Sequence, residues 1–100
     1  MMQYVPKYED KIEYIVEIIK DINNINILEL GVREGISTKK FLEVCEKNKG
    51  NLTSIDIDDC SNVSKDKNWK FIHSSDDNFE FVDKQIKKDL DFIYIDSYHE

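Results

Sequence analysis

The sequence predicts an α/β domain built on a parallel β-sheet. Four short apolar segments, residues 26–30, 52–57, 69–73 and 91–96, have the length and the β-branched or aromatic content of strands. Segments with apolar residues at helical spacing precede the first strand and lie between later ones. Strands that alternate with helices favour a parallel sheet, because parallel neighbours need a crossover connection. A chain of 100 residues is long enough for one small core, so one domain is expected.

The first helix is predicted over residues 8–22. Five aliphatic residues recur there at helical spacing: Ile12, Ile15, Val16, Ile19 and Ile22. Asn23 and Asn24 follow, and asparagine tolerates the left-handed backbone conformation that ends many helices. A second helix is expected after Gly35, ending between Asn48 and Gly50.

The remaining elements follow from polarity and spacing. Residues 58–68 are polar and are expected to form a connection between parallel strands, and Trp69 is expected to pack at the edge of the sheet. Ser75 and Asp76 are helix-capping residue types, and Phe79, Val82 and Ile86 share one face of the helix predicted after them. The uninterrupted apolar centre of residues 91–96 suits a parallel strand covered on both faces.

The composition excludes several functional classes. A net charge of −7 disfavours a nucleic-acid partner, which requires clustered lysine and arginine. The sequence shows no signal peptide and no apolar run near the ~20 residues that a membrane span needs, so a cytoplasmic protein without membrane contact is expected. Cys45 and Cys60 lack metal-ligand spacing and are expected to be reduced and unpaired.

Polar residues follow the predicted strands at the end where ligands bind in open α/β sheets. Glu29 and Gly31 close the first strand and Asp56 the second, and the other two end at Ser75 with Asp76 and at Asp96. Because the carboxyl ends of parallel strands share one edge of the sheet, these residues are expected to line a single site there. A plain turn-forming or helix-capping role is the alternative for Asp56, Ser75 and Asp76.

The turn after the first strand narrows the choice of ligand. Gly31 and Gly35 allow positive φ and close backbone approach to a ligand. A dinucleotide site would have Gly-x-Gly-x-x-Gly, but Glu29 and Glu34 stand in its first and third glycine positions and would repel a pyrophosphate. The Gly-Lys-Ser/Thr sequence that grips nucleoside triphosphates is absent as well. The alternative to a ligand site is that Glu29, Gly31 and Gly35 form only a tight strand–helix turn in another kind of α/β domain.

The motifs, taken in order, resemble those of class I S-adenosylmethionine-dependent methyltransferases. The stretch Ile-Leu-Glu-Leu-Gly-Val-Arg-Glu-Gly-Ile-Ser-Thr at 27–38 is similar to the family's first motif. Asp56 lies 56 − 35 = 21 positions after Gly35, close to the offset of about 20 for an acid that binds ribose hydroxyls. Residues 69–76 resemble the motif that flanks adenine, with serine and aspartate in place of the usual Gly-Asp, and residues 90–99 resemble the fourth-strand motif of O-methyltransferases.

The resemblance implies a partial Rossmann-like sheet in the order 3-2-1-4 with helices on both faces. It implies an enzyme that uses S-adenosylmethionine to methylate a hydroxyl of a small molecule or sugar. Its cofactor-binding residues would be Glu29 at the methionyl end, Gly31, Gly35, Ser37, Asp56 at the ribose, Ser75 and Asp76. In metal-dependent members Asp96 would bind Mg²⁺, which lowers the pKa of the acceptor hydroxyl, and His99 would take its proton. For His99 an exposed residue in a frayed tail is the alternative.

Two other functions stay open. The domain is expected to be truncated after the fourth strand, so the chain could be a cofactor-binding fragment without turnover. A receiver-type signalling domain would also place an aspartate like Asp96 after an apolar strand, but it needs an acidic pair where Gly31 and Val32 stand. In the order 3-2-1-4 the fourth strand lies at the margin of the sheet, and we expect self-association through this edge.

Overall fold

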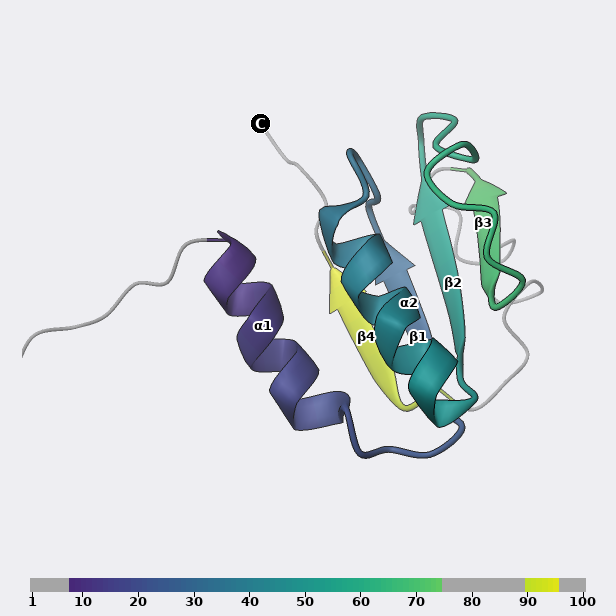
Figure 1. Cartoon of the computed structure of the whole chain (residues 1–100). Coiled ribbons are helices and arrows are strands. Elements are labelled where there is room, and N and C mark those ends of the chain that lie inside the picture. Colours follow the sequence, from purple (N-terminus) through teal and green to yellow (C-terminus); the bar gives the residue numbers. More distant parts are fainter. Residues whose placement is uncertain (1–7, 75–89, 96–100) are drawn as a thin grey trace, which may run out of the picture.

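The chain folds around a parallel four-stranded sheet in the order β3-β2-β1-β4. The structure, a computed structural model, describes residues 8–74 and 90–95. Its elements, labelled in Figure 1, are α1 (Tyr8–Ile19), β1 (Asn26–Leu30), α2 (Ile36–Asn48), β2 (Asn51–Asp56), β3 (Trp69–His73) and β4 (Phe92–Ile95). The predicted fold class and strand order are therefore confirmed. The helix predicted after Ser75 and Asp76 lies outside the described residues.

The two central strands carry the positions on which the candidate site depends. β1 pairs with β2 on one side and with β4 on the other, so that Glu29 is the register partner of Ser54 and of Tyr94. β2 ends one residue earlier than predicted, which leaves Ile57 beyond the sheet. Parallel pairing brings the ends of β1 and β2 to the same edge, at the top of Figure 1.

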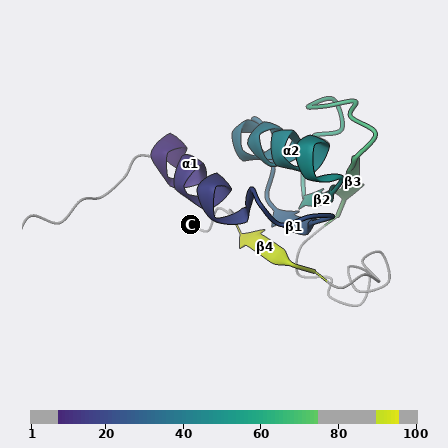
Figure 2. The same ribbon diagram turned by 60° about the horizontal axis from the view of Figure 1, so that its bottom comes forward.

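Both described helices cover the same face of the sheet, as Figures 1 and 2 show. The main core lies between them and the strands and contains Ile12 and Ile19 from α1, Phe41 from α2 and Ile27 from β1. The ring of Phe41 meets Tyr94 edge-on with the two centroids 5.3 Å apart, which ties α2 to the outermost strand. The expectation of helices on both faces stays a prediction.

Helix α1 ends at Ile19, three residues before the predicted end. The backbone N–H of Ile22 donates to the carbonyl of Ile19 at 3.1 Å, a tighter i−3 bond that closes the last turn. The Asn48 side chain donates to the carbonyl of Lys20 at 2.5 Å, so a contact from α2 satisfies this helix end. Asn24 has the left-handed conformation expected of this segment, with φ of 57°.

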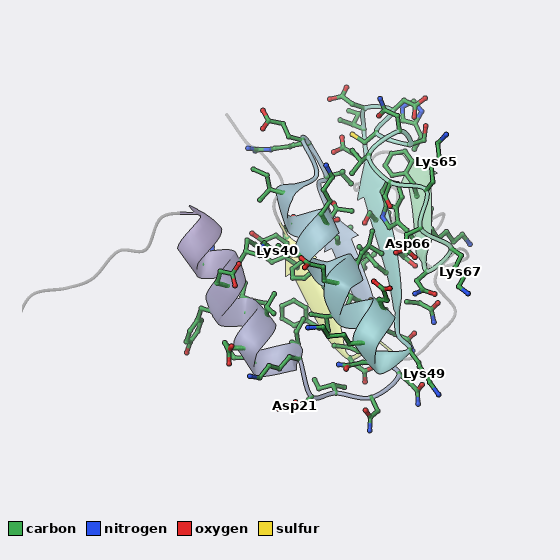
Figure 3. All side chains as sticks on the ribbon, in the orientation of Figure 1. Asp21, Lys40, Lys49, Lys65, Asp66 and Lys67 are labelled. Atoms are coloured by element: carbon green, nitrogen blue, oxygen red, sulfur yellow. The ribbon has the colours of Figure 1, made fainter. Side chains whose placement is uncertain are left out.

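An ion pair also joins the two helices. Lys40 of α2, labelled between the helices in Figure 3, lies 2.9 Å from the carboxylate of Glu13 on α1. Both side chains are exposed to solvent, so the pair contributes little to stability. The packing of Ile12 and Ile19 against α2 is the stronger link between these helices.

The other face of the sheet carries a second apolar cluster of Leu28, Ile55 and Ile72. Ile93 and Ile95, which alternate along β4 with the inward Tyr94, are 51% and 65% exposed. Within the described part of the chain, β4 is one of the two outer strands of the sheet, and β3 is the other. No helix among these residues is long and apolar enough to cross a membrane.

Candidate functional site

The turn between β1 and α2 has the conformation that its glycines predict. Gly31 and Gly35 have φ of 101° and 87°, values that other residues seldom adopt, and Arg33 between them is also left-handed with φ of 54°. The N–H of Gly31 donates to the carbonyl of Ile55 at 2.8 Å, so the turn begins while still bonded to β2. Helix α2 begins directly after the turn, at Ile36.

Asp56 meets this turn from the end of β2. One carboxylate oxygen, Oδ2, accepts the backbone N–H groups of Val32 at 2.7 Å and of Arg33 at 3.1 Å. The other oxygen, Oδ1, accepts the N–H of Asp58 at 2.9 Å. The structure thus brings together two of the predicted elements, the glycine turn and the acid, at the carboxyl ends of adjacent central strands.

The surroundings of Asp56 favour its charged form. Burial alone raises the pKa of Asp56, but the N–H groups of Asp58, Val32 and Arg33 stabilise the carboxylate and bring the pKa below its ordinary value. The residue is 9% exposed. The turn therefore holds a negative group with little contact with solvent.

The thiol of Cys60 lies beside this carboxylate. Burial, together with the charge of Asp56 and a hydrogen bond to it, raises the pKa of Cys60 to about 11. Burial likewise raises the pKa of Cys45, in the main core, to about 11. Both cysteines are free thiols, as expected, and at neutral pH they are protonated and poorly nucleophilic.

Glu29 lies beneath the turn and is 0% exposed. Its carboxylate accepts hydrogen bonds from the hydroxyls of Thr38 at 2.6 Å and Ser54 at 2.7 Å, and from that of Ser37. Ser37 and Thr38 are the second and third residues of α2, and both are buried. The carboxylate thus joins the start of α2 to β2. Direct contact of Glu29 or Ser37 with a cofactor stays a prediction.

The segment that follows β2 contacts the turn. Val63 lies against Gly35, where a Cβ atom would collide with its Cγ1. Ile57, directly after Asp56, is 71% exposed. The His73 ring nitrogen Nε2 lies 2.9 Å from the carbonyl oxygen of Ile57 and links the end of β3 to the same edge. An exposed apolar side chain and an imidazole therefore flank the buried acid.

The other predicted site residues lie outside the described part of the chain. These are Ser75 and Asp76, expected near adenine, and Asp96 and His99, expected to bind a metal and take a proton. Within residues 8–74 and 90–95, no group of three histidine, cysteine, aspartate or glutamate side chains could hold a metal ion. The predicted Mg²⁺ site is not tested by these residues.

Sequence reasoning did not single out Ser54 or the link from Trp69 to it. The indole N–H of Trp69 donates to the Ser54 hydroxyl at 2.8 Å, and Trp69 packs against the main core as expected. The available signal was its position in a central strand, two residues after the apolar Leu52. Side chains alternate along a strand, so Ser54 had to share a face with Leu52, which belongs to the core.

Comparison with known proteins adds no family to this picture. The chain matches no protein-family model, and no curated protein matches it. Its function is therefore inferred from the turn, the acid and the buried cluster behind them.

Proposed function

We propose that the chain binds S-adenosylmethionine at the carboxyl edge of β1 and β2, as class I methyltransferases do, and that it serves methyl transfer to a hydroxyl. The observation that carries the proposal is the contact between Asp56 and the turn that contains Gly31 and Gly35. It joins an acid suited to ribose hydroxyls with a backbone that a ligand can approach closely. A doubly wound sheet binds its ligands at this edge.

Charge further supports this choice of cofactor. Asp56 is anionic and Glu34 lies in the same turn, so a pyrophosphate would meet repulsion there. A nucleoside linked to a sulfonium amino acid carries no phosphate, and its ribose offers two hydroxyl donors to a carboxylate. Its own carboxylate would be attracted by the N-terminal end of α2, where backbone N–H groups lack helical acceptors.

A ribose hydroxyl can bind Asp56 only if one of the groups now hydrogen-bonded to its carboxylate gives up its place. An ionised carboxylate has about four acceptor positions, and three backbone N–H groups already use it. The Cys60 thiol is a fourth and weaker donor. Ribose hydroxyls would replace the thiol at least cost, because every backbone N–H that lost its acceptor would be left unpaired.

Calorimetric titration with S-adenosylhomocysteine tests the proposal. We expect it to bind more tightly than NAD or ATP, and Asp56→Ala to weaken its binding by about 1–3 kcal/mol, since polar partners lose their acceptor. Asp59→Ala is the matched control, because Asp59 is exposed and its hydrogen bonds among the described contacts are to Ser61, outside the glycine turn. Binding of NAD as tight as that of S-adenosylhomocysteine would overturn the assignment.

Turnover is a separate question from binding. Asp96 and His99, which the family resemblance assigns to metal binding and proton transfer, lie outside the described residues. The alternative function, a cofactor-binding fragment without catalysis, makes the same binding prediction. Methyl transfer to a hydroxyl acceptor, measured with and without Mg²⁺, separates the two.

We also propose self-association along the outer edge of β4. Among the described residues no strand pairs with the outer edge of β4, and an edge of this kind is a template for pairing with another chain. Ile93 and Ile95 add exposed apolar surface on the sheet face beside this edge. Ile93→Lys is expected to shift the chain toward monomer in sedimentation at high concentration. Ile57→Lys is the control, because Ile57 is also exposed but follows β2, which β1 separates from β4. A monodisperse wild-type monomer would remove this proposal.

A further inference from the structure

A buried chain of polar side chains runs from β3 to the start of α2. The indole N–H of Trp69 donates to the Ser54 hydroxyl at 2.8 Å, and Ser54 donates to Glu29 Oε1 at 2.7 Å. The same carboxylate accepts the hydroxyls of Thr38 and Ser37. Apart from the partly buried Trp69, all of these residues are excluded from solvent.

The direction of each hydrogen bond follows from the chemistry of the groups. An indole N–H only donates, so the oxygen of Ser54 must accept it. The single hydroxyl proton of Ser54 is then free to point at Glu29. The protons of Ser37 and Thr38 are likewise directed to the carboxylate, which accepts all three hydroxyls. Each hydroxyl therefore has one orientation rather than several.

This chain of contacts holds both ends of the glycine turn. Glu29 stands two residues before Gly31, and Ser37 stands two residues after Gly35. Ser54, the register partner of Glu29, comes two residues before Asp56 on the adjacent strand. A shift of the Glu29 carboxylate would move the first turn of α2 relative to Asp56. Small displacements of this kind change how well a preorganised site binds.

We propose that Ser54 and Trp69 are positioning residues for the cofactor-binding turn. Trp69 orients the hydroxyl of Ser54, Ser54 fixes the carboxylate of Glu29, and Glu29 holds Ser37 and Thr38 where α2 begins. Glu29 thus acts on the cofactor through the turn. This inference rests on the proposed binding of S-adenosylmethionine. It adds Ser54 and Trp69, the second of them on β3, to the residues that set the affinity for this cofactor.

Two conservative variants test this role by calorimetric titration with S-adenosylhomocysteine, well below the melting temperature of each protein. Trp69→Phe keeps an aromatic ring beside Phe71 but lacks the N–H, and Ser54→Ala removes the hydroxyl. We expect Trp69→Phe to weaken binding roughly three- to tenfold, with an equal or larger loss for Ser54→Ala. The double variant should bind within about twofold of Ser54→Ala, because the indole acts only through Ser54.

A control separates positioning from general loss of stability. Val44→Ala removes a buried side chain of α2 that belongs to the main core. It should lower the melting temperature and leave the affinity within about twofold of wild type. The chain contains one tryptophan, so its emission reports on Trp69 alone. We expect this emission to shift when S-adenosylhomocysteine saturates the wild type and to shift less in Ser54→Ala.

Each outcome decides between the two proposals. Wild-type affinity in Trp69→Phe and Ser54→Ala, additive losses in the double variant, or an equal loss in Val44→Ala would overturn the positioning role and leave cofactor binding intact. Absence of binding to the wild-type chain would overturn both.

Discussion

Replacement of Glu29 by alanine is expected to lower the free energy of unfolding by about 3–5 kcal/mol, because three buried hydrogen bonds are lost at about 1 kcal/mol or more each and a cavity is left behind. The hydroxyls of Ser37, Thr38 and Ser54 would lose their acceptor in a region without solvent, and a cavity would remain. A domain of this size has a total stability of about 5–15 kcal/mol. The variant should therefore unfold at much lower urea concentration than the wild type.

Urea denaturation followed by circular dichroism measures this effect. Glu43→Ala is the matched control, because it removes an exposed glutamate from α2 and should change stability by less than about 0.5 kcal/mol. Glu29→Gln keeps one carbonyl oxygen and should lie between the two. If Glu29→Ala were as stable as Glu43→Ala, the buried carboxylate would contribute nothing to the fold.

The strands could be predicted from the sequence because the pattern of apolar residues that marks them is local and strong. β1 and β3 have the predicted bounds, and β2 is shifted by one residue. The end of α1 depends on a contact from Asn48, which lies on another element, and periodicity carries no information about such a contact. The strand order came from the family resemblance.

The candidate site could be predicted in part, because two of its features depend only on the order of the strands. Asp56 and the glycine turn follow adjacent parallel strands, so their meeting required only the topology. Glu29 was predicted at the rim of the sheet because, with Gly31, it closes the first strand. Alternation puts its side chain with that of Ile27, in the helix-facing core, where its partners come from β2 and α2. Local pattern identifies the residue type, whereas the protein groups that surround it depend on how the strands and helices pack.

The second large effect is expected for Gly35→Val. Gly35 has φ of 87°, and a β-branched residue there is strained by about 1–3 kcal/mol. The new Cβ would also collide with Val63, and overpacking of this kind costs a further ~1–3 kcal/mol. Together they should lower the free energy of unfolding by about 2–6 kcal/mol in urea denaturation.

A double-mutant cycle separates the two contributions. In Gly35→Ala the collision and the backbone strain are both present, whereas in Gly35→Ala with Val63→Ala the colliding methyl groups are removed and the strain remains. We therefore expect the second change to recover part of the stability that the first removes, although Val63→Ala alone should be destabilising. Additive losses would mean that Val63 does not press on Gly35. Because this contact joins the segment after β2 to the turn, the rescued variant should also bind S-adenosylhomocysteine more tightly than Gly35→Ala.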